Sequence, residues 1–311
     1  PSRVSRACAM SAVLVHNGKA AIPWLTKQDL LHKYAGAYTT ARTVSRSSIF
    51  EFSMHCQRLV DTGKDVLRRK LEETPEMEGR FRRALTFLEL TNVRSVLKNE
   101  CLAAFEYLKG IEGTETSEYQ ITVLLTSDTA KDEGPGLDIF TYVQALPFVE
   151  ATVAVEARQA ERSNPTVKDV QWVNDRKQLE EIQRELQVNE LIMHDESGDV
   201  TEGLQTNFFA ELDGTLYTAP DERVLSGTVR KVVLEVAEAN GIPVKLECPN
   251  ISHIQRWGSC FICSTSGLVK PIHTLTSPEF GQRHFDSVGL AHRLEELVLQ
   301  SVQQHAEPLI E

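Results

Sequence analysis

The stretch that decides the fold of this chain runs from residue 200 to residue 219 and reads VTEGLQTNFFAELDGTLYTA. Asp213 and Gly214 separate two short runs of alternating apolar and polar residues, which is the strongest short-range signal for a β-hairpin. Glu202 stands just before the first strand, and Asn207 leads into it. A carboxylate beside an apolar strand either lies at the surface or is held inside for a chemical reason, and the stretch alone leaves both readings open.

The whole chain has the length and composition of a globular protein with about two domains. It has 311 residues, of which 41% are hydrophobic and 25% are charged, and it contains no apolar run that approaches the ~18 residues of a membrane-spanning helix. The net charge of −11 argues against nucleic acid as the main partner, because phosphate backbones need a basic surface. A small phosphorylated ligand can still bind such a protein through one local basic pocket.

The cysteines favour reduced thiols in an intracellular compartment. The six of them are scattered along the chain, which does not suit a disulfide framework. Cys260 and Cys263 have CxxC spacing, but no second ligand pair lies near them, so we expect buried strand residues there and no metal site.

The chain is expected to divide into two mixed α and β domains. Residues 1–10 contain two arginines and no acid, which fits either a targeting remnant or a disordered terminus. The polar run EARQAERSNPTVKD contains the breaker Asn164-Pro165, and it predicts an interdomain linker at 156–167. A small N-terminal domain is therefore expected at 11–155 and a C-terminal domain at 168–311. The location is left open between the cytoplasm and a plastid or other organelle.

Periodicity and capping signals give the expected elements. Strands are expected at 11–15, 37–44, 48–52, 120–127, 137–146, 242–249 and 259–266. Helices are expected after Thr26, through MHCQRLVDT, and at 93–110, 172–187, from 226 to 240 and over 288–306.

Five features far apart in the sequence are chemically complementary. Lys168 is a candidate nucleophile, Glu202 is a carboxylate, and Arg58 is a cation on a short helix. The helix start at 226–229 offers backbone N–H groups that can hold an anion, and residues 264–266 add hydroxyls and further backbone N–H groups. Each feature alone usually has a structural explanation, but together they match the parts of a pyridoxal phosphate site.

These residues resemble the class-IV aminotransferases, also called fold-type IV pyridoxal phosphate enzymes. The shared order is Glu202-Gly203, Asn207, Asp213-Gly214, Pro220 and then Gly227-Thr228-Val229-Arg230. The resemblance extends to NPTVKDVQW around Lys168, to the MHCQRL that contains Arg58, and to FICSTSGLVKPI. The family includes branched-chain and D-amino-acid aminotransferases and aminodeoxychorismate lyase.

The resemblance implies a fold and a role for each matched residue. The fold would be α+β, with a small N-terminal domain that roofs the site and a larger C-terminal domain with a barrel-like sheet. Lys168 would form the Schiff base with pyridoxal 5'-phosphate, and Glu202 would accept the N–H of its ring. The other cofactor-binding residues implied are Arg58, Asn207, Gly227, Thr228, Val229 and Thr265. Ser266 would face the substrate.

Two departures from the family pattern stand out. The family often has a tyrosine shortly after the lysine, and here Trp172 or Val173 stands in that place. Neither side chain can act as a phenol. At the phosphate site the usual Ile-Thr is replaced by Thr228-Val229, which keeps the backbone contacts.

The strand at 37–44 is the candidate substrate surface. Alternation places Tyr38, Thr40 and Arg42 on one face. Arg42 is either an outward charge on a half-buried strand or, as the resemblance implies, a partner for a substrate carboxylate.

Three functions remain open from the sequence. The first is an aminotransferase acting on an amino acid, which is preferred. The second is an aminodeoxychorismate lyase, which the run TTAR favours, and the third is a non-catalytic protein with this fold. The Arg-x-His pair of D-amino-acid aminotransferases and the Arg-Pro strand of branched-chain aminotransferases are both missing. A homodimer is expected from the resemblance.

Overall fold

The computed structural model describes residues 12–109, 118–130 and 134–310, and the chain divides into two compact units. Unit 1 is drawn from residues 1–147, 168–174 and 305–311, and unit 2 from residues 148–167 and 175–304. The segment 1–10, expected to be a targeting remnant or a disordered terminus, lies outside the described residues.

The unit boundaries differ from the expected ones at both ends of the linker. Strand β7 (Val153–Gln159) occupies the first part of the expected linker, because its alternating apolar residues pair in a sheet. Lys168 groups with unit 1, not with the C-terminal part as expected. Two backbone bonds, from Tyr38 N to Lys168 O and from Val170 N to Gly36 O, tie this short segment to a strand of unit 1.

Unit 1 is built on a seven-stranded antiparallel sheet. Its strand order is β16 (Ala306–Pro308), β4 (Ser48–Phe50), β3 (Ala37–Val44), β5 (Tyr119–Thr126), β6 (Asp138–Ala145), β1 (Ala12–His16) and β2 (Lys19–Ala21). The strand expected at 48–52 ends early, because Glu51 adopts a left-handed conformation with φ 50° and begins the next helix.

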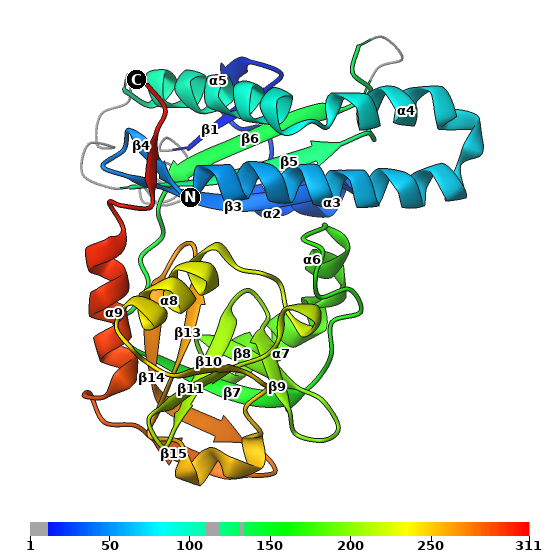
Figure 1. The fold of residues 1–311 in the computed structure, drawn as a ribbon. Coiled ribbons are helices and arrows are strands. Elements are labelled where there is room, and N and C mark those ends of the chain that lie inside the picture. The colour runs from blue at the N-terminus through cyan, green and yellow to red at the C-terminus, as the bar shows by residue number, and fades with distance from the viewer. Residues whose placement is uncertain (1–11, 110–117, 131–133, 311) are drawn as a thin grey trace. The chain divides into compact units, whose positions relative to one another are not determined.

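Three helices cover one face of this sheet, as Figure 1 shows: α3 (Phe52–Glu73), α4 (Glu78–Phe87) and α5 (Leu90–Lys109). A short 3₁₀ turn at Pro75–Met77 joins the first two. Helix α2 (Lys27–Lys33) contributes to the apolar cluster on the other face. Its start at Thr26 is a capping box with Asp29, as expected.

Unit 2 contains a closed six-stranded barrel. The ring runs through β10 (Asn207–Leu212), β13 (Ser259–Ser264), β14 (Leu268–Ser277), β7, β8 (Glu190–His194) and β9 (Val200–Gly203), and the β9–β10 pairing closes it. Strands β11 (Thr215–Thr218), β12 (Val244–Leu246) and β15 (Gly281–His284) extend it. The expected α+β class and barrel-like sheet are confirmed.

The remaining helices are α6 (Gln171–Asp175), α7 (Lys177–Leu186), α8 (Thr228–Ala239) and α9 (Leu290–Ser301), with 3₁₀ turns at Asp221–Arg223 and Ile251–Arg256. The single helix expected at 172–187 is interrupted at Arg176, which has non-helical ψ and begins α7. The closing helix is shorter than expected, and Ala306 begins strand β16 instead.

The hairpin predicted in the opening stretch is confirmed. Strands β10 and β11 pair with Leu212 opposite Thr215. Asp213 and Gly214 both have positive φ, at 52° and 76°, as a two-residue turn of type I′ requires.

Cys260 and Cys263 are both buried on β13, as expected for strand residues. Burial raises the pKa of the Cys263 thiol to about 12 and that of the Cys260 thiol well above its usual value. Within the described ranges no cluster of three or more His, Cys, Asp and Glu residues could hold a metal ion.

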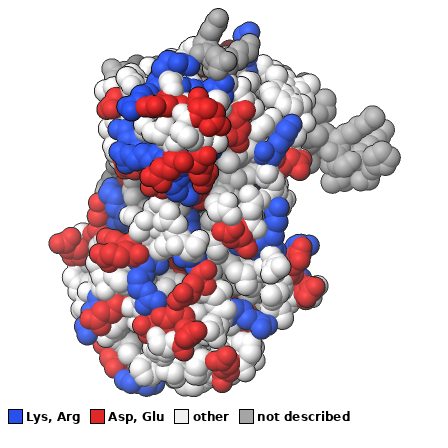
Figure 2. Space-filling model, turned by 90° about the vertical axis from the view of Figure 1, so that its right-hand side faces the viewer, with Lys and Arg blue, Asp and Glu red and all other residues white. Residues whose placement is uncertain are grey.

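Figure 2 shows lysine, arginine and acidic side chains intermixed on the face that it draws. No helix in the described part of the chain is both long and apolar enough to cross a membrane.

Removing the Phe209 ring should destabilise unit 2. Phe209 and Phe261 are register partners on β10 and β13, and their rings stack 4.7 Å apart, fully buried. We expect Phe209→Ala to cost about 3–5 kcal/mol of unfolding free energy, measured by urea denaturation. Phe148→Ala, at a ring that is 90% exposed, is the control, and equal loss in both variants would contradict the prediction.

Candidate active site

Glu202 lies inside the protein, at the end of β9. The residue is 4% exposed. One carboxylate oxygen, Oε1, lies 3.3 Å from Nη1 of Arg162, and the other, Oε2, accepts a hydrogen bond of 3.1 Å from the backbone N–H of Leu225. Because a guanidinium and an N–H donor both bond best to an ionised carboxylate, this setting suits a buried negative charge. Of the two readings open for Glu202, the structure excludes the surface acid.

Asn207 holds the same segment from the opposite strand. Asn207 and Glu202 are the register partners through which β10 pairs with β9. The side-chain amide of Asn207 donates a 2.8 Å hydrogen bond to the carbonyl of Leu225. Leu225 is thus gripped at both ends of its backbone, its N–H by Glu202 and its carbonyl by Asn207.

Leu225 leads directly into the start of helix α8. Gly227 is the N-cap residue, and no side chain caps the helix there. A β-carbon on Gly227 would lie 2.0 Å from Oδ1 of Asn207, so only glycine allows this close approach. The backbone N–H groups of Thr228 and Val229 occupy the first turn of a twelve-residue helix, which is the place where helices bind anions.

A hydroxyl pair joins this helix start to the β13–β14 turn. Oγ1 of Thr228 and Oγ1 of Thr265 lie 3.1 Å apart. Ser266 follows in the same turn and is half-buried. Within unit 2 the structure therefore brings together Glu202, Asn207, the Gly227–Val229 helix start and Thr265, all of which the sequence singled out.

Lys168 lies in unit 1 beside strand β3. Its Nζ is 4.9 Å from the centre of the Tyr38 ring, and its carbonyl accepts from Tyr38 N. The next residue, Asp169, is buried and bonds to Arg69 at 2.6 Å. The backbone of Lys168 is thus fixed on two sides, while its half-buried amine lies against an aromatic face.

Arg58 lies on α3, one turn after His55, and is half-buried. His55 is 1% exposed, and its Nδ1 lies 2.7 Å from the Thr39 hydroxyl. Burial, and then the charges of Arg58 and Lys168, hold the pKa of His55 well below its usual value. The ring is therefore neutral at physiological pH. Its Nε2 is buried, and no described residue forms a hydrogen bond with it.

The two faces of β3 pack in different apolar clusters. Tyr38 packs in the apolar cluster that includes Val170 and Val173, while Ala41 packs in the cluster on the α3 side. Thr40 and Arg42 share the face of Tyr38 by alternation, with Oγ1 of Thr40 3.5 Å from Oγ1 of Thr122.

Arg42 is half-buried on this strand. Burial lowers its pKa, and the opposing charge of Glu118 raises it. Glu118 itself accepts hydrogen bonds from the Thr43 hydroxyl and from the N–H groups of Ser45 and Arg46.

Trp172 and Val173 are both buried on α6. No phenol therefore stands at the place where the family often has a tyrosine. In unit 1 the described aromatic neighbour of the lysine amine is Tyr38 on a separate strand.

The residues present fit pyridoxal phosphate. In unit 2 a buried carboxylate stands next to a glycine-opened helix start, as a protonated ring nitrogen and a phosphate require. In unit 1 the buried Nε2 of His55 has no hydrogen-bond partner among the described residues, and the charges of Arg58 and Lys168 act on the same ring.

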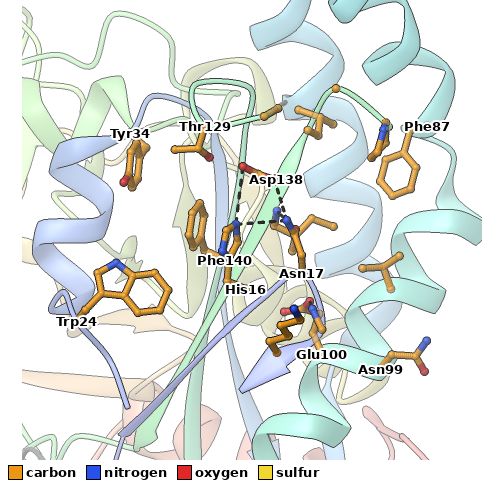
Figure 3. A pocket seen from close by; sticks show the side chains of 18 residues that line it. His16, Asn17, Trp24, Tyr34, Phe87, Asn99, Glu100, Thr129, Asp138 and Phe140 are labelled. Atoms are coloured by element: carbon orange, nitrogen blue, oxygen red, sulfur yellow. Dashed lines mark hydrogen bonds and ion pairs between the residues drawn. The ribbon is translucent and has the colours of Figure 1, made fainter. Parts of the chain in front are cut away.

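A separate cavity of about 860 Å³ lies in unit 1, and none of the expected site residues lines it. Figure 3 shows its rings: Phe140 stacks on His16 at 4.2 Å and on Tyr34 at 5.5 Å. Asp138 accepts a 2.8 Å bond from Asn17 in its wall.

A buried carboxyl in the wall of this cavity, that of Glu100, also bonds to the turn between β1 and β2. Glu100 accepts from Gly18 N at 2.5 Å, and burial raises the pKa of Glu100. These polar groups hold the β1–β2 turn and carry no part of the chemistry expected from the sequence.

The sequence did not single out Arg162, His55, Thr39 or the backbone of Leu225. His55 carried a signal, because it belongs to the same His-x-x-Arg motif as Arg58. Arg162 looked like one of several linker charges, although its second contact, to the carbonyl of Val167 just before Lys168, ties it to the site.

Gly227→Ala should disrupt the helix start. The new methyl group would overlap Oδ1 of Asn207 and displace the amide that holds Leu225. We expect about 1–3 kcal/mol of lost stability and a dissociation constant for pyridoxal phosphate raised about tenfold or more, measured by thermal unfolding and cofactor titration. In the control Gly79→Ala, the nearest atom is a flexible arginine end 3.9 Å away. Wild-type affinity in Gly227→Ala would contradict the prediction.

The structural comparison supports the fold. A branched-chain aminotransferase from Thermoproteus uzoniensis, solved with norvaline, superposes with a TM-score of 0.69 at 16% identity, over 96% of this chain and 99% of that one. A hypothetical aminotransferase from Mycobacterium tuberculosis in its PLP-bound form gives a TM-score of 0.68 at 17% identity, over 94% and 99%.

The curated relatives are also aminotransferases. A probable branched-chain-amino-acid aminotransferase of Rickettsia conorii is 24% identical over 81% of this chain and 89% of its own length. A D-alanine aminotransferase of Staphylococcus haemolyticus is 30% identical over 37% of this chain. The alignments with it and with a Rickettsia felis relative span 44% and 36% of those proteins.

The model of the family described as amino-transferase class IV matches residues 36–275, which is most of the chain. This match covers both sets of site residues and confirms the expected cofactor, since class IV aminotransferases use pyridoxal phosphate. The chain belongs to the class IV aminotransferase family.

Proposed function

We propose that this protein is a pyridoxal phosphate-dependent aminotransferase that acts on an amino acid. The observation that carries the proposal is the grip on Leu225. A buried carboxylate and a buried amide hold one residue, and that residue opens the helix whose N-terminus suits a phosphate. A ring nitrogen and a phosphate on one ligand would be met by groups that are already fixed relative to each other.

Each side chain then has a task. Bound pyridoxal phosphate supplies a carbonyl carbon for amines and a ring that accepts electrons. Glu202 would accept a hydrogen bond from the ring N–H, and Arg162 would pair with the Glu202 carboxylate. Lys168 would hold the cofactor through its amine and would move the proton at the substrate Cα.

The phosphate is assigned to several donors at once. The N–H groups of Thr228 and Val229 and the hydroxyl of Thr265 would hold it. The family resemblance also assigns Arg58 to the phosphate. A dianion held by a helix N-terminus and a guanidinium is a common arrangement in proteins.

Tyr38, Thr40, Arg42 and Ser266 are proposed to contact the substrate, with Arg42 as the partner of its carboxylate. Three of the proteins named above are described as aminotransferases for branched-chain amino acids or for D-alanine, so a small amino acid is the proposed substrate class. The lyase reading rests on the run TTAR alone.

We extend the proposal to a homodimer, as expected from the family resemblance. Unit 1 exposes large apolar side chains, Ile22 at 71% and Trp24 at 56%. Their exposure supports an interface with a second copy of the chain on that unit.

A half-reaction tests the activity. Purified protein loaded with pyridoxal phosphate should show the visible absorption of a lysine-bound cofactor, and a donor amino acid should bleach it without any second substrate. Lys168→Ala should abolish both the band and its response, because the bonding amine is gone. Lys177→Ala, at an exposed lysine of α7, should behave like the wild type.

The outcomes separate the functions. A wild type that shows no visible band with cofactor would overturn the enzyme assignment. Restoration of the band by an added keto acid selects the transaminase. Release of pyruvate from aminodeoxychorismate without any keto acid would select the lyase instead.

A further inference from the structure

The turn that joins Glu202 to Asn207 is held by side chains outside the site described above. This turn, Leu204–Thr206, links β9 to β10. Gly203 N donates to Thr206 O at 2.8 Å, and Leu204 N donates to Leu191 O at 3.1 Å. The turn therefore fixes how the strands that carry Glu202 and Asn207 meet.

Glu190, at the start of β8, grips this turn from behind. It is 4% exposed. Its Oε2 accepts from Gln205 N at 3.3 Å, and its Oε1 accepts from Leu191 N at 3.1 Å. One carboxylate thus joins the backbone of β8 to the middle residue of the turn.

Gly203 packs closely against Glu190 and Thr206. A β-carbon on Gly203 would lie 3.0 Å from Cγ of Glu190 and 2.2 Å from Oγ1 of Thr206. A side chain at position 203 would therefore overlap the Thr206 hydroxyl and press on Glu190, so glycine is required next to Glu202.

Arg176 grips the same turn from the start of α7. It is 7% exposed, and its Nη1 donates to the carbonyl of Leu204 at 3.4 Å. Its Nε is anchored on Glu180 at 2.8 Å. Arg176 also attracts the charge of Glu190.

We propose that Glu190 and Arg176 are positioning residues that act as one clamp on the Leu204–Thr206 turn and thereby set Glu202 and Asn207 for the cofactor. A buried carboxylate is costly unless it is bonded and paired, and here both of its oxygens accept N–H bonds and an arginine lies nearby. The part that concerns the cofactor rests on the proposed function.

The charge state of Glu190 links the clamp to pH. Burial raises the pKa of Glu190 to about 7. The N–H groups of Gln205 and Leu191, the charge of Arg176 and the hydroxyl of Thr206 each lower this pKa, but by less than burial raises it. Two further charged residues, Lys270 and Glu150, line the cavity of about 360 Å³ that Glu190 borders, and Lys270 pairs with Glu295. Protonation below this pKa puts a proton on an oxygen that accepts an N–H bond and removes the attraction to Arg176, so the clamp loosens as pH falls.

The sign for stability is the opposite. The pKa of Glu190 is higher in the folded protein than the about 4.3 of a free glutamate, so folding favours the protonated form. Between about pH 4.3 and pH 7 the folded state loses part of its stability as pH rises. Glu190→Gln removes this loss, so its stability relative to wild type should rise with pH over that window.

Glu190→Gln, which keeps the side-chain shape, tests the clamp without cofactor. Hydrogen exchange of the Leu225 amide in the full chain should be about fivefold faster in the variant above pH 7, since one bond to the turn is weakened. The wild-type difference in exchange between pH 6 and pH 8, corrected for the intrinsic rate, should vanish in it. Glu185→Gln, at an exposed glutamate of α7, is the matched control and should follow wild type.

Titration with pyridoxal phosphate is the second arm of the experiment. The dissociation constant should rise about three- to tenfold in Glu190→Gln. Arg176→Gln should weaken cofactor binding less in the Glu190→Gln background than in the wild type. Unchanged Leu225 exchange in Glu190→Gln would overturn the clamp. A wild type that binds no cofactor would instead overturn the proposed function, while the exchange arm would still decide the clamp.

Discussion

One residue without any reactive side chain organises the candidate site. Leu225 gives its N–H to Glu202 and receives the Asn207 amide at its carbonyl. Because Glu202 and Asn207 face each other across the β9–β10 pairing, three strands and loops meet at this residue. The pairing also closes the barrel of unit 2. The same strand pairing therefore closes the barrel and positions the Glu202 carboxylate.

The contacts of Leu225 with Glu202 and Asn207 also position the start of α8. Two residues after Leu225, Gly227 packs so closely on Asn207 that no β-carbon fits. Glu202 and the start of α8 are thus held together by side-chain bonds to the backbone of Leu225 and by the close contact between Gly227 and Asn207. Preorganisation of this kind lowers the entropy lost when a ligand binds.

Much of this could be predicted from the sequence, since its signals are local. The Asp213-Gly214 turn and the capping box at Thr26 each follow from a few adjacent residues, and both are confirmed. The barrel could be expected only by resemblance, because the parallel pairing of β7 with β14 joins segments more than 100 residues apart. The grouping of Lys168 with unit 1 depends on backbone bonds to β3, which leave no mark in the composition of the linker.

The residues that escaped prediction share a physical reason. Backbone groups such as those of Leu225 have no sequence signature. From the sequence alone Glu190 and Arg176 are expected to lie at the surface, because charged residues are seldom buried. Only the structure shows that both are buried and directed at one turn. Local patterns therefore identify the groups proposed to bind the cofactor more readily than the groups that support them.

A double-mutant cycle on cofactor affinity tests the central claim most directly. Glu202→Gln, Asn207→Ala and the double variant would be titrated with pyridoxal phosphate alongside wild type. If both side chains act through Leu225, the two losses should fall short of additivity by about 1 kcal/mol or more. Losses that add within about 0.5 kcal/mol would mean that the two residues act independently, and would contradict the account.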